Sequence, residues 1–244
     1  QSIPSYLIAA ALPPIMREAG VSRTAIGYLS LLFLPLVLKF LWAPYVDRLR
    51  PFARAHRAGW IIVTQTGVIL CILALLPLGP THVIGIIAVG FVASLLISTQ
   101  DIATDGYAAK YLPPEDRAIG NAIQGGSIAF GVVIGGTFGL LLYHYAGWTT
   151  MLLVIAAFSL LPLIAAFAMR ESDPVAPQQA PRPSIMAFLR RTEVRQVLWI
   201  ALIYRVSEGL VKAMEGPYLV DAGVPLNQIG YLPGISATTA GLAG

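Results

Sequence analysis

GVSRTAIGYL at residues 20–29 returns as GVPLNQIGYL at residues 223–232, so that both stretches fit the pattern G-V-x4-I-G-Y-L. The same offset, 223 − 20 = 203 residues, aligns Pro14 with Pro217 and Glu18 with Asp221. A match at one fixed offset is typical of a duplicated structural unit. Chance similarity between two apolar segments is the alternative, because Ile, Leu and Gly are abundant in this chain. We infer a duplication, and it sets the organisation of the whole molecule.

The composition is that of a membrane protein. Hydrophobic residues make up 57% of the chain and charged residues 11%, whereas soluble domains carry about 25% charged residues. A spanning helix needs about 20 mostly apolar residues. The chain opens inside an apolar segment, which suggests that residues are missing upstream. We expect spans near residues 1–16 (partial), 26–46, 58–78, 83–108, 118–143, 148–169 and 196–219, with an eighth beginning near Asn227.

The distribution of Lys and Arg predicts the orientation in the membrane. The loops after the first, third, fifth and seventh spans hold only Arg17 and Arg23. The loops after the second, fourth and sixth spans are strongly basic, and cytoplasmic loops are the ones that carry such an excess. We therefore place the N-terminus and the proline-rich stretch 170–195 in the cytoplasm. The basic residues of these loops are Arg48, Arg50, Arg54, Arg57, Lys110, Arg117, Arg170, Arg182, Arg190, Arg191 and Arg195.

The two repeat copies each lie between a first and a second span of the same orientation. The repeat is therefore parallel and six spans long, which is the organisation of transporters built from two parallel six-helix halves. We predict an all-α membrane protein with about seven and a half of twelve helices. Its parts are an N-terminal bundle (1–169), a cytoplasmic linker (170–195) and the start of a C-terminal bundle (196–244).

The fourth span, VIGIIAVGFVASLLISTQDIATDGY at residues 83–107, carries two carboxylates inside an apolar run. Asp101 and Asp105 are one helical turn apart and share a face, which Ser98 continues backwards. A charge at the centre of a membrane helix costs about 2.5–3.5 kcal/mol and is usually functional. We expect this polar face to border a hydrated cavity on a transport path.

Lys39 in the second span falls at a depth similar to that of Asp101, since both helices run toward the cytoplasm. An intramembrane lysine needs a partner, and Asp101 is the first candidate, Asp105 the second. The alternative is that Lys39 extends to the cytoplasmic surface along Trp42. Two acids and one lysine leave one acid unpaired, and we expect that acid to bind and release a proton.

The seventh span holds a second charged face, on which each neighbouring pair is placed to interact. Mutual neutralisation of these charges is one interpretation. The other is a charged wall of a substrate cavity, with Glu208 as a third proton carrier and Tyr204 beside it. The residues of this face are Arg205, Glu208, Lys212 and Glu215. By the repeat offset, Gln1 and Ser5 would face the same cavity from the first span, and Gln124 is a weaker candidate.

The fifth span carries Gly131, Gly135 and Gly139 at every fourth position, a spacing that allows close helix packing. The single cysteine, Cys71, excludes an intrachain disulfide. The three histidines have no ligand-like spacing, and no phosphate loop, nucleophile elbow or catalytic triad pattern occurs. We expect no metal, no cofactor and no enzymatic activity.

Two motifs resemble a known family. They are Lys39-Phe-Leu-Trp-Ala-Pro-Tyr-Val-Asp47-Arg48 and Thr99-Gln-Asp-Ile-Ala-Thr-Asp-Gly106, and they look like the AmpG-like and acetyl-CoA-transporter-like branch of the major facilitator superfamily. Gly120-Asn-Ala-Ile-Gln-Gly-Gly126 and Leu31-Leu-Phe-Leu-Pro35 are most similar to its ferric-siderophore importers. The resemblance implies a twelve-helix fold in the bacterial inner membrane and a gating role for Asp47 and Arg48. Ala43 stands where the gating motif usually has glycine.

These observations predict a secondary active, proton-coupled importer of a bulky solute such as a ferric siderophore. A muropeptide or acetyl-CoA permease is the alternative, and a lipid-handling membrane protein without transport coupling is a rival of another class. Arg205, Lys212 and Lys39 would attract negative groups on the solute. The expected partners are the lipid bilayer, a small-molecule solute and protons, with no nucleic acid, and the chain is expected to be a monomer.

Overall fold

A computed structural model describes residues 1–52, 55–169, 171 and 190–232. Within these residues the fold is all-α, and its β pairing is limited to an isolated bridge between Phe52 and Ala55. Four helical stretches are long and apolar enough to cross a membrane: Arg23–Leu41, Arg57–Ala74, Val83–Tyr111 and Pro114–Ala168. The last contains two crossings, because the chain turns back at Gly147, whose φ is 80°. Helices lie at each of the expected spans, and the predicted all-α membrane fold is confirmed.

The first span consists of α1 (Ser2–Tyr6), a π-helical segment η1 (Leu7–Ala11) and α2 (Leu12–Glu18). Pro13 and Pro14 cannot donate to the carbonyls of Ala9 and Ala10, which both lie in η1. A proline inside a helix removes a hydrogen bond and displaces the carbonyl four residues earlier. The π-helical turn therefore accommodates the proline pair without ending the helix.

The second span differs from the continuous helix that we expected for residues 26–46. It runs as α3 (Arg23–Gly27), a 3₁₀ segment η2 (Tyr28–Phe33), α4 (Leu34–Leu38), a second 3₁₀ segment η3 (Lys39–Leu41) and α5 (Ala43–Arg48). The reason is the same, since Pro35 and Pro44 follow the two 3₁₀ segments. As a result Lys39 lies in an irregular turn and not in a regular helix.

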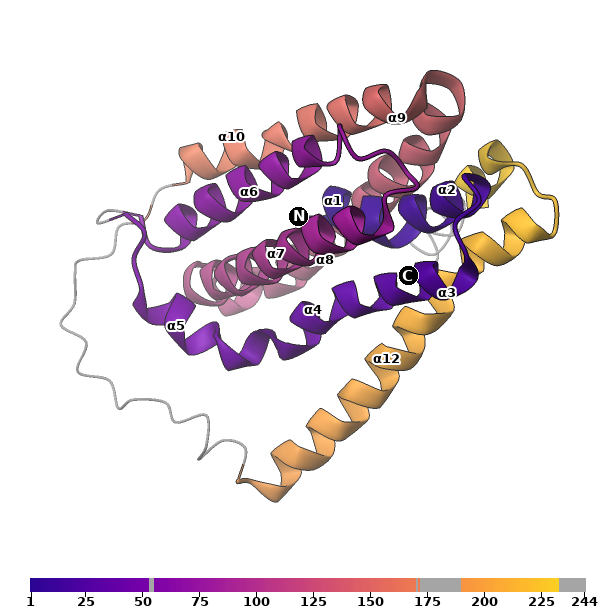
Figure 1. Cartoon of the computed structure of the whole chain (residues 1–244). Coiled ribbons are helices and arrows are strands. Elements are labelled where there is room, and N and C mark those ends of the chain that lie inside the picture. Colours follow the sequence, from indigo (N-terminus) through magenta and orange to yellow (C-terminus); the bar gives the residue numbers. More distant parts are fainter. Residues whose placement is uncertain (53–54, 170, 172–189, 233–244) are drawn as a thin grey trace.

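The remaining spans form two antiparallel pairs (Figure 1). The helix α6 (Arg57–Ala74) packs along α7 (Val83–Tyr111). After η4 (Pro114–Asp116), the fifth span is built from α8 (Arg117–Gly131), the π-helical η5 (Val132–Phe138) and the start of α9 (Gly139–Phe158). The end of α9 and α10 (Leu160–Ala168) return along α6 as the sixth span.

A buried polar chain ties three of these helices together. The Gln100 side chain of α7 donates through Nε2 to Gln65 Oε1 on α6, at 2.9 Å. Gln65 in turn donates to the carbonyl oxygen of Ser159, between α9 and α10, at 2.7 Å. All three residues are buried. Buried polar groups require such partners, so this chain fixes the register of α6 and α7 against the sixth span.

The glycines of the fifth span make a close helix contact, as the sequence predicts, and the first span is the partner. A side-chain carbon added at Gly131 would collide with Ser2, and one at Gly135 would collide with the carbonyl oxygen of Ile3. At Gly139 it would lie 3.5 Å from Ala11 Cβ. The backbones of α1, η1 and η5 therefore approach as closely as small residues permit.

We expect Gly135→Ala to lower the midpoint of thermal unfolding of the full-length protein in detergent. The added methyl group over-packs the contact with the first span, at a cost on the order of 1–3 kcal/mol. Gly125→Ala is the matched control, because a side-chain carbon added there would meet no atom within 4 Å outside the backbone of its own helix, and alanine favours helix. Equal midpoints for the two variants would contradict the close-packing interpretation.

The seventh span is α12 (Thr192–Asp221), a single helix of 30 residues. It packs on α2, η1, α3 and η2 through its C-terminal part, and it diverges from the bundle toward Thr192 (Figure 1). A last helical segment, residues 226–232, follows the turn at Gly223. The two halves of the repeat therefore meet at one end of the bundle.

Candidate functional site

Lys39 and the two carboxylates of the fourth span form one cluster. The Lys39 ammonium of η3 donates a hydrogen bond to Asp101 Oδ2 on α7. The same nitrogen lies 3.6 Å from Asp105 Oδ2, one turn further along α7. The expected partner of Lys39 is therefore present, and the lysine turns inward instead of extending to the cytoplasmic surface. One ammonium group serves two carboxylates, and it favours Asp101.

The first span completes the shell around Asp101. Gln1 Nε2 donates to Asp101 Oδ1 at 2.7 Å, so both oxygens of this carboxylate are engaged. The Ser5 hydroxyl donates to the Gln1 carbonyl at 2.9 Å, which orients the first turn. Gln1 thus contacts an acid of α7 and lines the larger cavity described below, whereas Ser5 contacts the Gln1 backbone. The prediction that Gln1 and Ser5 share a cavity with the seventh span stays a prediction.

A second contact fixes the position of Lys39. The indole nitrogen of Trp42 donates to Thr99 Oγ1 on α7 at 3.1 Å, and Thr99 donates to the Leu95 carbonyl at 2.8 Å. Trp42 directly follows η3. The end of the 3₁₀ turn is therefore tied to α7 two residues before Asp101, which holds the lysine toward that helix.

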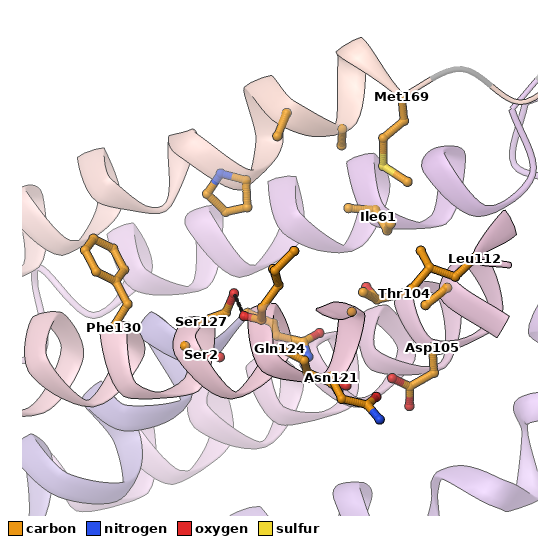
Figure 2. A pocket seen from close by; sticks show the side chains of 18 of the residues that line it. Ser2, Ile61, Thr104, Asp105, Leu112, Asn121, Gln124, Ser127, Phe130 and Met169 are labelled. Carbon is orange, nitrogen blue, oxygen red and sulfur yellow. Dashed lines mark hydrogen bonds between the residues drawn. The ribbon is translucent and has the colours of Figure 1, made fainter. Parts of the chain in front are cut away.

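A cavity of about 1140 Å³ lies beside this cluster, enclosed by α1, α6, α7, α8 and α10 (Figure 2). Its two walls differ in chemistry. Ile61 and Met169 lie on the apolar wall, from α6 and the end of α10, and Phe130 extends that wall from α8. Asp105, Asn121 and Gln124 line the opposite wall, from α7 and α8. The cavity therefore offers hydrogen-bonding groups on one side and hydrocarbon on the other.

A smaller cavity of about 600 Å³ lies on the other side of Asp105. Lys39, Asp47, Arg57 and Lys110 are among the residues that line it. Asp105 borders both cavities, and its side chain is 51% exposed, whereas that of Asp101 is 17% exposed. Of the two acids, Asp105 is therefore the one that is exposed to the cavities.

One end each of the second, third and fourth spans, at the side that we place in the cytoplasm, meets the others at Arg57, the first residue of α6. Arg57 Nη2 lies 2.8 Å from Asp47 Oδ1. Its guanidinium lies against Gly106, where an added side-chain carbon would be 2.5 Å from Cζ. Glu171 accepts hydrogen bonds from the backbone amides of His56 and Ala58 at the start of α6. This cluster links Asp47 to α7 and to the beginning of the linker.

The sequence did not single out Arg57 as the partner of Asp47. The resemblance implies a gating role for Asp47 and Arg48, whereas Arg57 is only one of the basic residues of the loop in the sequence. Arg48 is exposed and makes a contact of its own. Gly106, the last residue of the Thr99–Gly106 motif, was the available signal, since it leaves the space that Arg57 fills.

The other predicted site residues lie apart from this cluster. Ser98 is 1% exposed and lines neither cavity, because α7 turns it into the bundle. Tyr204, Lys212 and Glu215 are exposed on α12. The side chains of Arg205 and Glu208 lie outside the described residues. The predicted charged face of the seventh span is therefore described only at Lys212 and Glu215, which line neither cavity.

We expect Lys39→Met to lower the midpoint of thermal unfolding, because it leaves the Asp101 carboxylate in the bundle without its ammonium partner. Breaking a buried ion pair by removing one partner costs about 3–5 kcal/mol, and the partial exposure of this pair reduces that cost. Adding Asp101→Asn should restore part of the loss, since the amide is neutral. A double variant that is less stable than Lys39→Met would contradict the pairing.

Comparison with known proteins gives a consistent result. The sequence model of the Major Facilitator Superfamily matches residues 2–244. The anhydromuropeptide permease of Escherichia coli K12 is 26% identical over 98% of this chain and 51% of its own length. A protein named putative transporter AmpG 3, from Rickettsia typhi, is 24% identical over 93% of this chain and 59% of its own length. The chain thus spans about half the length of the curated relatives it matches.

Proposed function

Because the chain belongs to the Major Facilitator Superfamily, we propose that it forms the N-terminal half and the first helix of the C-terminal half of a proton-coupled importer. The family and the apolar helices make it a multi-pass membrane transporter. The bacterial inner membrane as location, the cytoplasmic linker, the coupling ion and the solute are parts of this proposal. The two relatives described above are named as a permease and as a putative transporter, which supports a transport function.

The single observation that carries the proposal is the sharing of Lys39 between two carboxylates of α7. While Asp105 is ionised, the cluster carries one positive and two negative charges. Protonation of Asp105 makes the cluster neutral and leaves Lys39 to Asp101 alone. A neutral cluster has a lower desolvation free energy in the low-dielectric interior than a charged one. Asp105 is the better proton carrier, because it borders both cavities while Asp101 is held by Gln1 and Lys39.

The solute that we propose is a muropeptide-like molecule. The first support is the name of the Escherichia coli relative, an anhydromuropeptide permease. The second is the cavity of about 1140 Å³, which exceeds the roughly 300–1,000 Å³ of usual small-molecule sites. Its amide-bearing wall suits sugar and peptide groups, and its apolar wall suits the carbon faces of sugar rings.

The ferric siderophore that the sequence favoured is the second candidate. The motifs at Gly120–Gly126 and Leu31–Pro35 suggest it, but none of the relatives described above is named as a siderophore transporter. The two solutes share a bulky, polar and anionic character, so the Lys39 cluster does not separate them.

Uptake by the full-length protein in liposomes separates these cargoes. We expect an anhydromuropeptide, and not a ferric siderophore, to accumulate when an inwardly directed proton gradient is imposed. Accumulation of the siderophore alone would favour the second candidate. Uptake of neither solute, or uptake that ignores the gradient, would contradict the proposal at the level of cargo or of coupling, respectively.

Asp105→Asn should abolish the acceleration of uptake by the proton gradient while solute exchange at equal concentrations continues. The amide imitates the protonated acid and cannot release a proton. Asp116→Asn is the matched control, since Asp116, the last residue of η4, is exposed and lines neither cavity. If Asp105→Asn responded to the gradient like the control, Asp105 would not be the coupling group.

A further inference from the structure

A second cluster of charges lies at the end of the bundle where the two halves meet. Arg17 Nε donates to Asp221 Oδ1 at 2.6 Å, and Arg23 Nε donates to Asp221 Oδ2 at 2.5 Å. Arg17 also donates through Nη1 to the Val21 carbonyl at 3.0 Å. One carboxylate is therefore held by two guanidinium groups, and one of these is itself fixed to the loop between α2 and α3.

The three residues come from both halves of the repeat. Arg17 lies in the last turn of α2 and Arg23 begins α3, both in the N-terminal half. Asp221 is the last residue of α12, the first helix of the second half. Beside them the backbones approach closely, since a side-chain carbon added at Gly216 would lie 2.8 Å from Pro14 Cδ. Ion pairs and close packing thus coincide at one end of the interface.

Within the described residues, the N-terminal part of α12 is not packed against other helices in the same way. Val197, Trp199, Ile200 and Ile203 are all more than 60% exposed, and the helix leaves the bundle in this direction (Figure 1). Over the described part of the chain, α12 therefore contacts the first half at its Asp221 end and diverges from it toward Thr192.

The repeat shows that these ion pairs have no counterpart in the second copy. At the offset of 203, Arg17 corresponds to Val220 (17 + 203) and Arg23 to Leu226 (23 + 203), both apolar. Glu18, the counterpart of Asp221, is exposed. If the ion pairs only supported the repeated fold, each copy of the repeat should contain them. They occur in one copy, so only one side of the pseudo-symmetric interface carries these ion pairs.

The ion pairs of Arg17 and Arg23 with Asp221 also explain why these two basic residues lie on the side of the membrane where Lys and Arg are otherwise sparse. Arg17 and Arg23 are the basic residues of the loops that we place on the outer side, where Lys and Arg are sparse. Both bind the same carboxylate. Their presence in loops that otherwise lack basic residues is explained by this contact between the halves.

We propose that Arg17, Arg23 and Asp221 form an ion-pair latch that keeps the outer end of the two halves closed and opens when the transporter faces outward. Ion pairs near the surface are individually weak. The latch therefore shifts the balance between the inward-open and outward-open forms without preventing their exchange. The inference rests on the proposed transport function for its role, but its test does not require transport.

The test measures access from outside to a buried position behind the latch. Ala213 lies on α12 and is 2% exposed. A single cysteine is introduced there as Ala213→Cys in a Cys71→Ser background of the full-length protein, in right-side-out vesicles. The rate of labelling by a membrane-impermeant thiol reagent then reports how often the outer end opens.

We expect Asp221→Asn to raise this labelling rate severalfold, and Arg17→Gln with Arg23→Gln to do the same. Glu18→Gln is the matched control, because it neutralises the repeat-equivalent carboxylate at the same end of the bundle and should leave the rate unchanged. An unchanged rate in Asp221→Asn, or an equal rise in Glu18→Gln, would overturn the latch.

A charge exchange keeps the test conclusive if Asp221→Asn unfolds the protein. Arg23→Asp combined with Asp221→Arg restores opposite charges, and its labelling rate should return toward that of the parent. Labelling after denaturation gives the total thiol and identifies unfolded protein. Failure of the exchange to slow labelling, with folded protein present, would also overturn the latch. None of these results depends on the cargo or on Asp105.

Discussion

An ammonium group inside a membrane protein must be neutralised, and the pairing of Lys39 with Asp101 meets this requirement. Several features of the bundle hold the two residues of this pair in position. The prolines of the second span break that span into short helical segments, which place Lys39 in a 3₁₀ turn. Trp42 ties the end of this turn to Thr99, and Gln1 brings the first span to the free oxygen of Asp101. The first, second and fourth spans are thus joined around one carboxylate.

The two ends of the bundle use different ionic contacts for different purposes. At the end where we place the cytoplasm, Asp47, Arg57 and Gly106 join three spans of the same half. At the other end, Asp221 joins the two halves through Arg17 and Arg23. The Lys39 cluster lies between the two ends. Both Asp101 and Gly106 lie on α7, so the Lys39 cluster and the Asp47–Arg57 contacts share one helix.

Much of this architecture could be predicted because it depends on local sequence patterns. The length of the apolar stretches predicted the spans. The repeat at Gly20 and Gly223 predicted their organisation in two parallel halves. The depth of Lys39 in its helix predicted Asp101 as its partner. The glycine spacing predicted close packing of the fifth span, and the structure identifies the first span as its partner. The failures came where packing between helices decides the outcome. Ser98 shares a helical face with Asp101, yet the neighbouring helices bury it. The Asp47–Arg57 pair depends on how α5 and α6 meet, which spacing along the chain does not specify.

The central claim is that Asp105 takes up a proton when solute occupies the adjacent cavity. A solute with carboxylate groups would be repelled by an ionised Asp105, so binding and protonation favour each other, and such coupling is reciprocal. The most direct measurement is the proton uptake that accompanies addition of an anhydromuropeptide to the purified full-length protein in weakly buffered detergent. The account predicts uptake of protons by the wild type and none by Asp105→Asn, which should still bind the solute. Proton uptake of the same size in Asp105→Asn would contradict it.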